Sequence, residues 1–366
     1  MKRTPLYRKH LDLQARMGSF AGFEMPIRYS TVLEEHRAVR TRAGLFDLSH
    51  MGEIRIGGPG AEPFLQRMTV NDVSKLEPGA AQYTVMCTHG GGIVDDCVLY
   101  RVDGEYVLVV NAANVEKDLQ WLRDHRTPGV ELDDISDETC LIAVQGPGSR
   151  ELLGPLVDDP SVLEGLPFYH HLKLKLAGRD VLFARTGYTG ELGYEIYATP
   201  PDGLFLWETL LEGGQSSGIR PVGLGARDTL RIEMKFCLYG NDIDESTNPI
   251  EAGLGWIVKS GKGPFLGSTA IEKIRSRGPE RKLVGFEMMD RAIPRNGYPI
   301  LIREKECGQV TSGCHSPSLG KGIGMGYVPT PFAKPGTNIE IEIRGRGRPA
   351  RIVKTPFWKH GTATTF

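Results

Sequence analysis

Hydrophobic residues at helical spacing predict two helices near the N-terminus. Thr4 precedes Pro5, which is typical of an N-cap followed by proline at the first helical position, and an apolar stripe continues to Leu13. Thr31 and Glu34 have the spacing of a capping box, and apolar residues follow it at helical spacing. We therefore expect one helix to begin after Thr4 and another after Thr31.

Alternating apolar and polar residues after Gln82 predict a small antiparallel meander. Three runs are typical of strands, namely Tyr83–Cys87, Ile93–Tyr100 and Tyr106–Val110. The last two are joined across Asp103-Gly104, a dipeptide that favours hairpin turns. Asn114 then suits the start of an amphipathic helix. Because this order lacks the regular rhythm of a parallel Rossmann sheet, we expect antiparallel pairing.

A second round of strand and helix patterns follows and predicts a second lobe. Its expected elements are strands at Leu141–Gln145, Asp180–Ala184 and Tyr194–Tyr197, and helices near Ser149 and over Leu204–Leu211. The expected fold class is therefore α+β, with two α/β lobes built on antiparallel sheets.

The segment Leu224–Phe236 predicts one helix that carries two arginines. Arg227 and Arg231 are four residues apart and therefore lie on the same face of that helix. This face is a candidate anion site.

Beyond about residue 278 the helical pattern gives way to short β-rich runs separated by Gly and Pro. These runs include Lys282–Met288, Ile339–Ile343 and Ala350–Lys354. We expect a C-terminal β-barrel over residues 278–366, and two interleaved lobes over residues 1–277.

The composition limits the kinds of binding partner and cellular compartment that we expect. Lys and Arg number 44 and Asp and Glu 45, a net charge of -1, so overall charge gives no reason to expect nucleic acid or an anionic membrane as partner. No run approaches the roughly 20 apolar residues that a spanning helix needs. The six cysteines are scattered without a C-x-x-C pair, which favours reduced thiols in a cytosolic compartment.

The most informative local feature is the run from Gly90 to Tyr100, where Asp95 and Asp96 interrupt an otherwise apolar strand. Successive side chains on a strand point to opposite faces, so only one of the two can line a given pocket. A carboxylate held in a partly dry pocket has a raised pKa and suits proton transfer. The alternative is that both aspartates end the strand or pair with an arginine.

A second feature is the segment Gly187–Glu195, a glycine-rich turn that leads into a strand. It brings Tyr188 and Glu195 together with a further tyrosine and glutamate. An aromatic face and a carboxylate suit a flat heterocycle with paired N–H donors, such as a pterin. A polar hairpin is the alternative.

Other local signals point to no chemistry. The pair His170-His171 has no carboxylate or cysteine at ligand spacing, so we expect no metal. Gly223-Leu224-Gly225 lacks the full dinucleotide fingerprint, and nothing near Ser49-His50 forms a nucleophile elbow.

Five segments together carry a resemblance to a known family. They are Asp47–Gly52, Gly91–Asp96, Arg185–Glu191, Gly225–Arg231 and Leu238–Asp242. In this order they resemble the signature segments of the T-protein family of the glycine cleavage system, and the match extends from about Thr4 to Phe357. The resemblance implies a three-domain cloverleaf around a folate pocket, with a central channel that admits the lipoyl arm of the H-protein.

By the same resemblance the chain is a tetrahydrofolate-dependent aminomethyltransferase. It would move the one-carbon unit from aminomethyl-lipoyl H-protein to tetrahydrofolate, giving 5,10-methylenetetrahydrofolate and ammonia. Asp96 matches the catalytic carboxylate and Glu195 the residue that grips the pterin. The other matched folate-binding positions are Met51, Tyr83, Asn111, Tyr188, Arg227 and Trp256. Arg227 also suits a carboxylate such as the glutamate tail of folate.

One departure lies in the tail. Residues 356–362 lack the Arg or Tyr that relatives place over the folate, and Lys359 or His360 is the candidate substitute. Two alternatives keep the fold: a folate-binding accessory protein for iron–sulfur enzymes, and a folate-dependent demethylase of a small donor. No Rossmann fingerprint is present, so no flavin is expected. No transit peptide is visible, which favours a bacterial cytoplasm, or the mitochondrial matrix for a processed eukaryotic protein.

Overall fold

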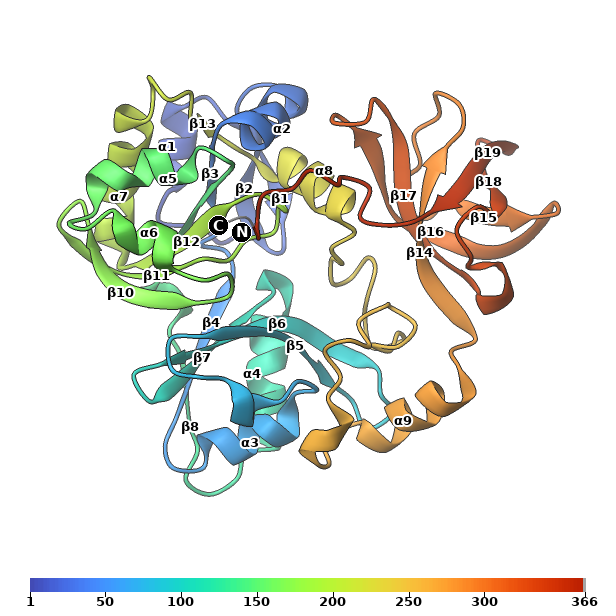
Figure 1. Ribbon diagram of the computed structural model, residues 1–366, viewed down its shortest axis with the longest axis horizontal. Helices are drawn as coiled ribbons and strands as arrows, with labels where there is room; N and C mark the ends of the chain where they lie inside the picture. Colours follow the sequence, from blue (N-terminus) through green and yellow to red (C-terminus); the bar gives the residue numbers. More distant parts are fainter. Residues whose placement is uncertain (365–366) are drawn as a thin grey trace.

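The computed structural model describes residues 1–364. Figure 1 shows three bodies arranged as a cloverleaf, one on a six-stranded sheet, one on a five-stranded sheet and one a closed barrel. The predicted α+β class, with two sheet-based lobes and a C-terminal β-barrel, is confirmed.

The first body is a sheet of order β10-β11-β12-β9-β3-β13 with helices packed on it. All neighbouring strands are antiparallel except β13 and β3, which form a short parallel pair. Its strands are β3 (Gly44–Asp47), β9 (Cys140–Gln145), β10 (His171–Leu176), β11 (Arg179–Ala184), β12 (Gly193–Ala198) and β13 (Arg220–Pro221). Its helices are α1 (Tyr7–Asp12), α2 (Val32–Thr41), α5 (Ser149–Leu153), α6 (Ser161–Gly165), α7 (Pro200–Gly213) and α8 (Leu224–Met234).

The second body is inserted between β3 and β9 of the first. Its antiparallel sheet has the order β5-β6-β7-β4-β8, and the chain returns to the first body at β9. Its elements are β4 (Gly52–Gly57), α3 (Ala61–Met68), β5 (Ala81–Cys87), β6 (Ile93–Val102), β7 (Glu105–Val110), α4 (Val115–Asp124) and β8 (Glu131–Asp134). The two lobes are therefore interleaved along the chain.

The third body is the barrel, which closes in the order β14-β17-β16-β15-β18-β19. Its strands are β14 (Arg281–Met288), β15 (Pro299–Ile302), β16 (Lys305–Ser316), β17 (Lys321–Pro329), β18 (Asn338–Ile343) and β19 (Arg346–Val353). The domain boundary predicted after residue 277 stays a prediction; it coincides with the junction between α9 (Ser268–Arg277) and β14.

Smaller elements complete the chain. A hairpin is formed by β1 (Arg16–Phe20) and β2 (Phe23–Arg28). The 3₁₀ turns are η1 (Val73–Lys75), η2 (Ala112–Asn114), η3 (Ser136–Glu138), η4 (Gly154–Leu156), η5 (Ser260–Lys262) and η6 (Thr330–Phe332). In the residues that the structure describes, no helix is long and apolar enough to cross a membrane.

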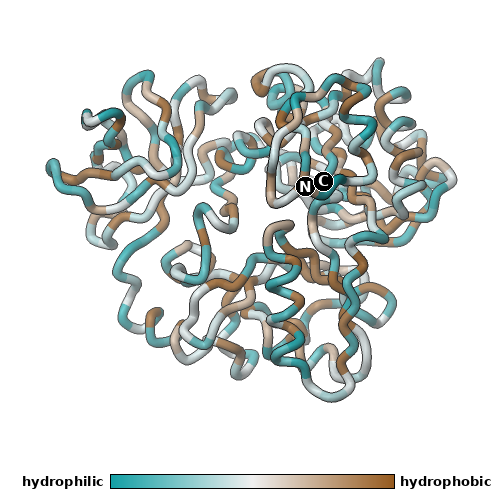
Figure 2. Tube along the Cα trace, turned by 180° about the vertical axis from the view of Figure 1, so that it is seen from behind, coloured by the Kyte–Doolittle hydropathy of each residue, from teal (hydrophilic) through white to brown (hydrophobic). Residues whose placement is uncertain are grey.

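Each sheet buries one face under helices, and the two sheets share a further core. Trp207 lies in the core of the first body and Phe64 in that of the second. A separate cluster joins Phe46 and Ala143 of the first sheet to Val109 of the second. Figure 2 shows hydrophobic residues following the strands, while many of the outer loops are hydrophilic. The faces that meet between the lobes are thus held by apolar burial.

The start of α2 follows the predicted capping box, but the start of α1 differs from the prediction. Thr31 accepts from the backbone N–H of Glu34, and the Glu34 side chain accepts from that of Thr31. The Thr4 hydroxyl does not cap α1, because it donates to the buried Asp47 carboxylate at 2.7 Å. A tertiary partner therefore replaces the local role expected of Thr4.

Candidate active site

The two aspartates of β6 point to opposite faces of the strand. Asp95 shares its face with Cys97, toward the core under α3 and α4, whereas Asp96 shares the other face with Val98, which packs between the lobes. Asp95 is fully buried and Asp96 is partly exposed. The alternation expected of a strand therefore makes Asp96 the carboxylate that can meet a ligand.

Two predicted site residues hold the Asp96 carboxylate. The hydroxyl of Tyr83 and the side-chain amide of Asn111 each donate to it at 2.9 Å. Tyr83 reaches it because Val85, two residues along β5, is the direct register partner of Asp96. Burial, followed by the charge of Asp95, raises the pKa of Asp96 to about 7, despite these two hydrogen bonds.

Two stacked aromatic rings lie beside this carboxylate. The rings of Tyr83 and Trp256 stack with centroids 6.3 Å apart and an interplanar angle of 24°. Trp256 is 65% exposed, which is unusual for so large an apolar side chain. Met51 is partly exposed and packs against the core between the lobes.

The loop before β12 carries the second predicted aromatic residue. The Tyr188 ring stacks on Phe236 at 5.7 Å, and its hydroxyl donates to the carbonyl of Cys237. Burial raises the pKa of Tyr188, and the charge of Asp96 contributes to the shift, so the two groups are neighbours. The segments around Asp96 and Tyr188 thus converge on one region.

Glu195 lies on β12 with one carboxylate oxygen occupied and one available. Thr186 donates to its Oε2 at 2.5 Å and Tyr100 at 3.4 Å. Within residues 1–364 its Oε1 has no hydrogen bond. Burial raises the pKa of Glu195, while Thr186 and the nearby charge of Arg227 lower it in part. The sequence analysis did not identify Tyr100 or Thr186, which hold this carboxylate in place.

The two arginines of α8 have different environments, so the predicted two-arginine anion face is wrong. Arg231 is buried and bonds Asp242 at 2.6 Å, Asp228 at 2.8 Å and Ser312 at 2.7 Å. Arg227 is partly exposed and lies 4.7 Å over the Tyr188 ring. In the described part of the chain the Arg227 guanidinium has no ion pair or hydrogen bond, so of the two arginines it alone is available to an anionic or carbonyl group.

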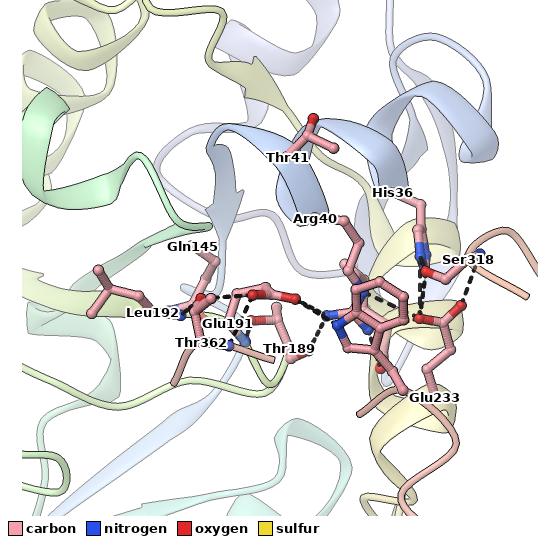
Figure 3. Close-up of polar contacts among 12 residues, drawn as sticks. His36, Arg40, Thr41, Gln145, Thr189, Glu191, Leu192, Glu233, Ser318 and Thr362 are labelled. Atoms are coloured by element: carbon pink, nitrogen blue, oxygen red, sulfur yellow. Dashed lines mark hydrogen bonds and ion pairs between the residues drawn. The ribbon is translucent and has the colours of Figure 1, made fainter. Parts of the chain in front are cut away.

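A buried ionic network fixes the loop that contains Tyr188 (Figure 3). Arg40 on α2 bonds Glu191 and Glu233, each at 2.8 Å, and donates to the carbonyl of Thr189 at 2.6 Å. His36 lies 3.3 Å from Glu233. Sequence patterns gave no signal for this network, because its partners are about 150 to 200 residues apart.

The C-terminal segment joins the same network. It runs from the barrel across α8 to the first body, as Figure 1 shows. Trp358 donates to Glu191 Oε1 at 2.9 Å, and the Thr362 hydroxyl donates to Oε2 at 2.6 Å. Lys359 and His360, the candidate folate contacts of the tail, are exposed. The tail therefore binds the loop through Trp358 and Thr362.

Other polar groups contribute structure. The Ser49 hydroxyl donates to the carbonyl of Leu141 and accepts from its N–H. His50 is buried, and burial followed by the charge of Arg227 lowers its pKa to about 4. Within residues 1–364 no three His, Cys, Asp or Glu side chains are arranged to bind a metal. A cavity of about 610 Å³ beside Glu53 and Tyr197 contains none of the predicted site residues.

Comparisons with known proteins cover nearly the whole chain. Residues 6–262 match the family model described as the GCVT N-terminal domain, and residues 281–359 match the glycine cleavage T-protein C-terminal barrel domain. The chain is 49% identical to an aminomethyltransferase of Halothermothrix orenii, over 98% of this chain and 100% of the relative. It is 50% identical to an aminomethyltransferase of Bacteroides thetaiotaomicron, with the same coverage.

A solved structure extends the likeness to the whole fold. The crystal structure of glycine cleavage system aminomethyltransferase T from Bartonella henselae matches with a TM-score of 0.92 at 35% identity, over 99% of each chain. The family predicted from the five ordered segments is confirmed: the chain belongs to the glycine cleavage T-protein family of aminomethyltransferases.

Proposed function

We propose that this chain transfers the aminomethyl carbon from lipoylated H-protein to tetrahydrofolate, with Asp96 as the catalytic residue. The products are 5,10-methylenetetrahydrofolate, ammonia and dihydrolipoyl H-protein. The observation that carries the proposal is the partly exposed Asp96 carboxylate between Tyr83 and Asn111, with its pKa raised to about 7. The named relatives are bacterial, which supports the cytoplasm as the place of action.

The available polar groups fit a folate. Glu195 has a free carboxylate oxygen for the N–H groups of a pterin, and Arg227 has free N–H groups for its carbonyl oxygen. The charges of these two residues interact, so both lie near one ligand group, which favours the pterin over the glutamate tail for Arg227. Tyr188, Met51 and the exposed Trp256 offer apolar surface. When bound, tetrahydrofolate supplies the two nitrogens that accept the carbon.

Asp96 has two proposed roles, to stabilise positive charge and to transfer a proton. Its carboxylate stabilises positive charge that develops on the aminomethyl group, because a partly dry site screens this attraction less than water does. A group whose pKa is raised to about 7 is protonated below that pH and ionised above it. Asp96 can therefore exchange a proton near neutral pH, and the rate should rise as pH increases through about 7 if the ionised form is required.

The test measures ammonia release from aminomethyl-loaded H-protein, with and without tetrahydrofolate. Asp96→Asn keeps the shape of the side chain, so the variant should fold and bind folate but lose about 10²- to 10⁴-fold in kcat. The matched control is Asp124→Asn, an exposed residue at the end of α4, which should keep wild-type rates. Equal rates for the Asp96 variant and wild type would remove Asp96 from the mechanism.

The two alternatives give different outcomes in the same assay. An accessory protein for iron–sulfur enzymes binds folate without releasing ammonia. A demethylase forms 5-methyltetrahydrofolate from a small methyl donor supplied in place of H-protein, and it releases no ammonia. A strict requirement for both lipoylated H-protein and folate supports the transferase.

A further inference from the structure

A second buried carboxyl lies behind the strand that carries Asp96. Asp118 on α4 is 0% exposed, and within residues 1–364 no donor gives a hydrogen bond to either of its oxygens. An ionised carboxylate that is buried without donors is strongly disfavoured, so the group is expected to carry a proton. A protonated carboxyl then needs an acceptor.

Asp95 is that acceptor. It already receives the backbone N–H of Asn111 at 3.0 Å, the side-chain amide of Asn111 at 2.9 Å and that of Asn114 at 2.6 Å. All three bonds are donated by N–H groups, so Asp95 is the acceptor in each. Asp118 follows Asn114 by one turn of α4, so its side chain lies on the same face of the helix as the amide that bonds Asp95. Burial, then the charge of Asp95 and a side-chain hydrogen bond with it, raise the pKa of Asp118 to about 11.

The remaining ionisable groups around Asp118 do not replace this partner. Lys117 directs its ammonium to the carbonyl of Val94 at 2.5 Å and to the hydroxyl of Tyr239 at 2.8 Å, with Glu245 at 4.0 Å. Burial raises the pKa values of the Cys97 thiol and the Tyr239 hydroxyl, so both are neutral near pH 7. Asp96, on the other face of β6, adds a second negative charge that favours the protonated form of Asp118.

We propose that Asp118 donates a proton to Asp95, and that this pair of one neutral and one ionised carboxyl is a positioning device for Asp96. The link is Asn111, whose side-chain amide bonds Asp95 and Asp96, each at 2.9 Å. The charge of Asp95 is also one of the causes that raise the pKa of Asp96. Asp118 is thus a positioning residue, and its kinetic role rests on the proposed function of Asp96.

Infrared difference spectroscopy tests, without any activity assay, whether Asp118 carries a proton. At about pH 9 Asp96 is ionised while Asp118 remains protonated, because their pKa values are about 7 and about 11. The wild-type spectrum minus that of Asp118→Asn should contain the band of a buried protonated carboxyl. Other buried carboxyls with a raised pKa, such as Glu53, are present in both proteins, so their bands cancel in the difference. A spectrum that lacks this band overturns the proposal.

The pH profile of kcat/KM tests the positioning role. Asp118→Asn keeps a neutral donor toward Asp95, so the acidic limb should stay within about 0.3 pH units of wild type. If Asp118 were ionised, this change would remove a negative charge and move the limb to lower pH, which would overturn the proposal. Asp118→Leu removes the hydrogen-bond donor, so more negative charge remains on Asp95 and the pKa of Asp96 rises. The acidic limb should therefore move to higher pH by about 0.5 pH unit or more.

The two proposals fail in different ways. A wild-type profile without a limb near pH 7 would contradict the role of Asp96 and leave the infrared result standing. Circular dichroism establishes that the Leu variant is folded before its profile is compared; if it does not fold, the Asn variant and the infrared band decide.

Discussion

Arg227 and Arg231 lie on the same face of α8, but only the guanidinium of Arg227 is available to a ligand. Arg231 has its charge satisfied by Asp242 and Asp228, whereas within residues 1–364 the Arg227 guanidinium lies over the Tyr188 ring and has no ion pair. A guanidinium without a carboxylate partner is pre-arranged for a ligand, because no protein bond must break when the ligand arrives. Arg227 is therefore the cation of this helix that we propose for folate binding.

The part of folate that meets Arg227 can be tested by a change in both protein and ligand. Arg227→Met should weaken binding of tetrahydrofolate by about 10- to 100-fold, the loss of a charged hydrogen bond. The same factor is expected for tetrahydropteroate, which lacks the glutamate tail, because the proposed contact is to the pterin. Isothermal titration calorimetry measures both. A defect that disappears with tetrahydropteroate would assign Arg227 to the tail instead.

Helices α2 and α8 are coupled by the buried network of Arg40, Glu191 and Glu233. Burial alone would raise the pKa of Glu233, but the hydrogen bond and charge of His36 and the charge of Arg40 outweigh it and lower the pKa to about 2. Both glutamates therefore share one guanidinium. The network links the loop that contains Tyr188 to both helices and, through Ser316, to the barrel.

Removal of that guanidinium should be severe. Arg40→Met leaves two buried carboxylates short of a counter-charge, so we expect a loss of about 3–5 kcal/mol in the free energy of unfolding, measured in urea. The control is Arg37→Met, an exposed position on the same helix without an ion pair in the described residues, where the change should stay within about 0.5 kcal/mol. Similar midpoints for the two variants would show that the network contributes little.

At the scale of the molecule, sequence patterns predicted what is local and missed what is distant. The capping box at Thr31, the hairpin at Asp103-Gly104 and the alternation at Asp95 depend on a few neighbouring residues, and the structure has all three. Thr4 was assigned wrongly because Asp47, 43 residues away, takes its hydroxyl. Arg231 was assigned wrongly because Asp242 pairs with it after the chain turns back. Long-range partners of this kind leave no periodic signal in a sequence.

A further set of distant contacts holds the C-terminal segment against α8 and the loop before β12. The C-terminal segment passes over α8, where the N–H groups of Phe357 and Trp358 bond the carbonyl of Glu233. Farther along, the N–H of Leu192 donates to the Thr362 hydroxyl at 2.9 Å. The tail therefore holds the loop before β12 from outside while Arg40 holds it from within.

A chain that ends at Phe357 should keep its barrel but loosen this loop. Without Thr362 the Leu192 amide loses its acceptor, so its hydrogen exchange should accelerate while the amides of β14 and β17 stay protected. Tetrahydrofolate affinity should fall by about 10-fold, because the loop must be ordered again when the ligand binds. Lys354→Ala, at an exposed position just before the removed segment, serves as control and should change neither quantity. If the shortened chain binds folate as tightly as wild type and Leu192 remains protected, the tail has no part in positioning the loop, and Arg40 alone must hold it.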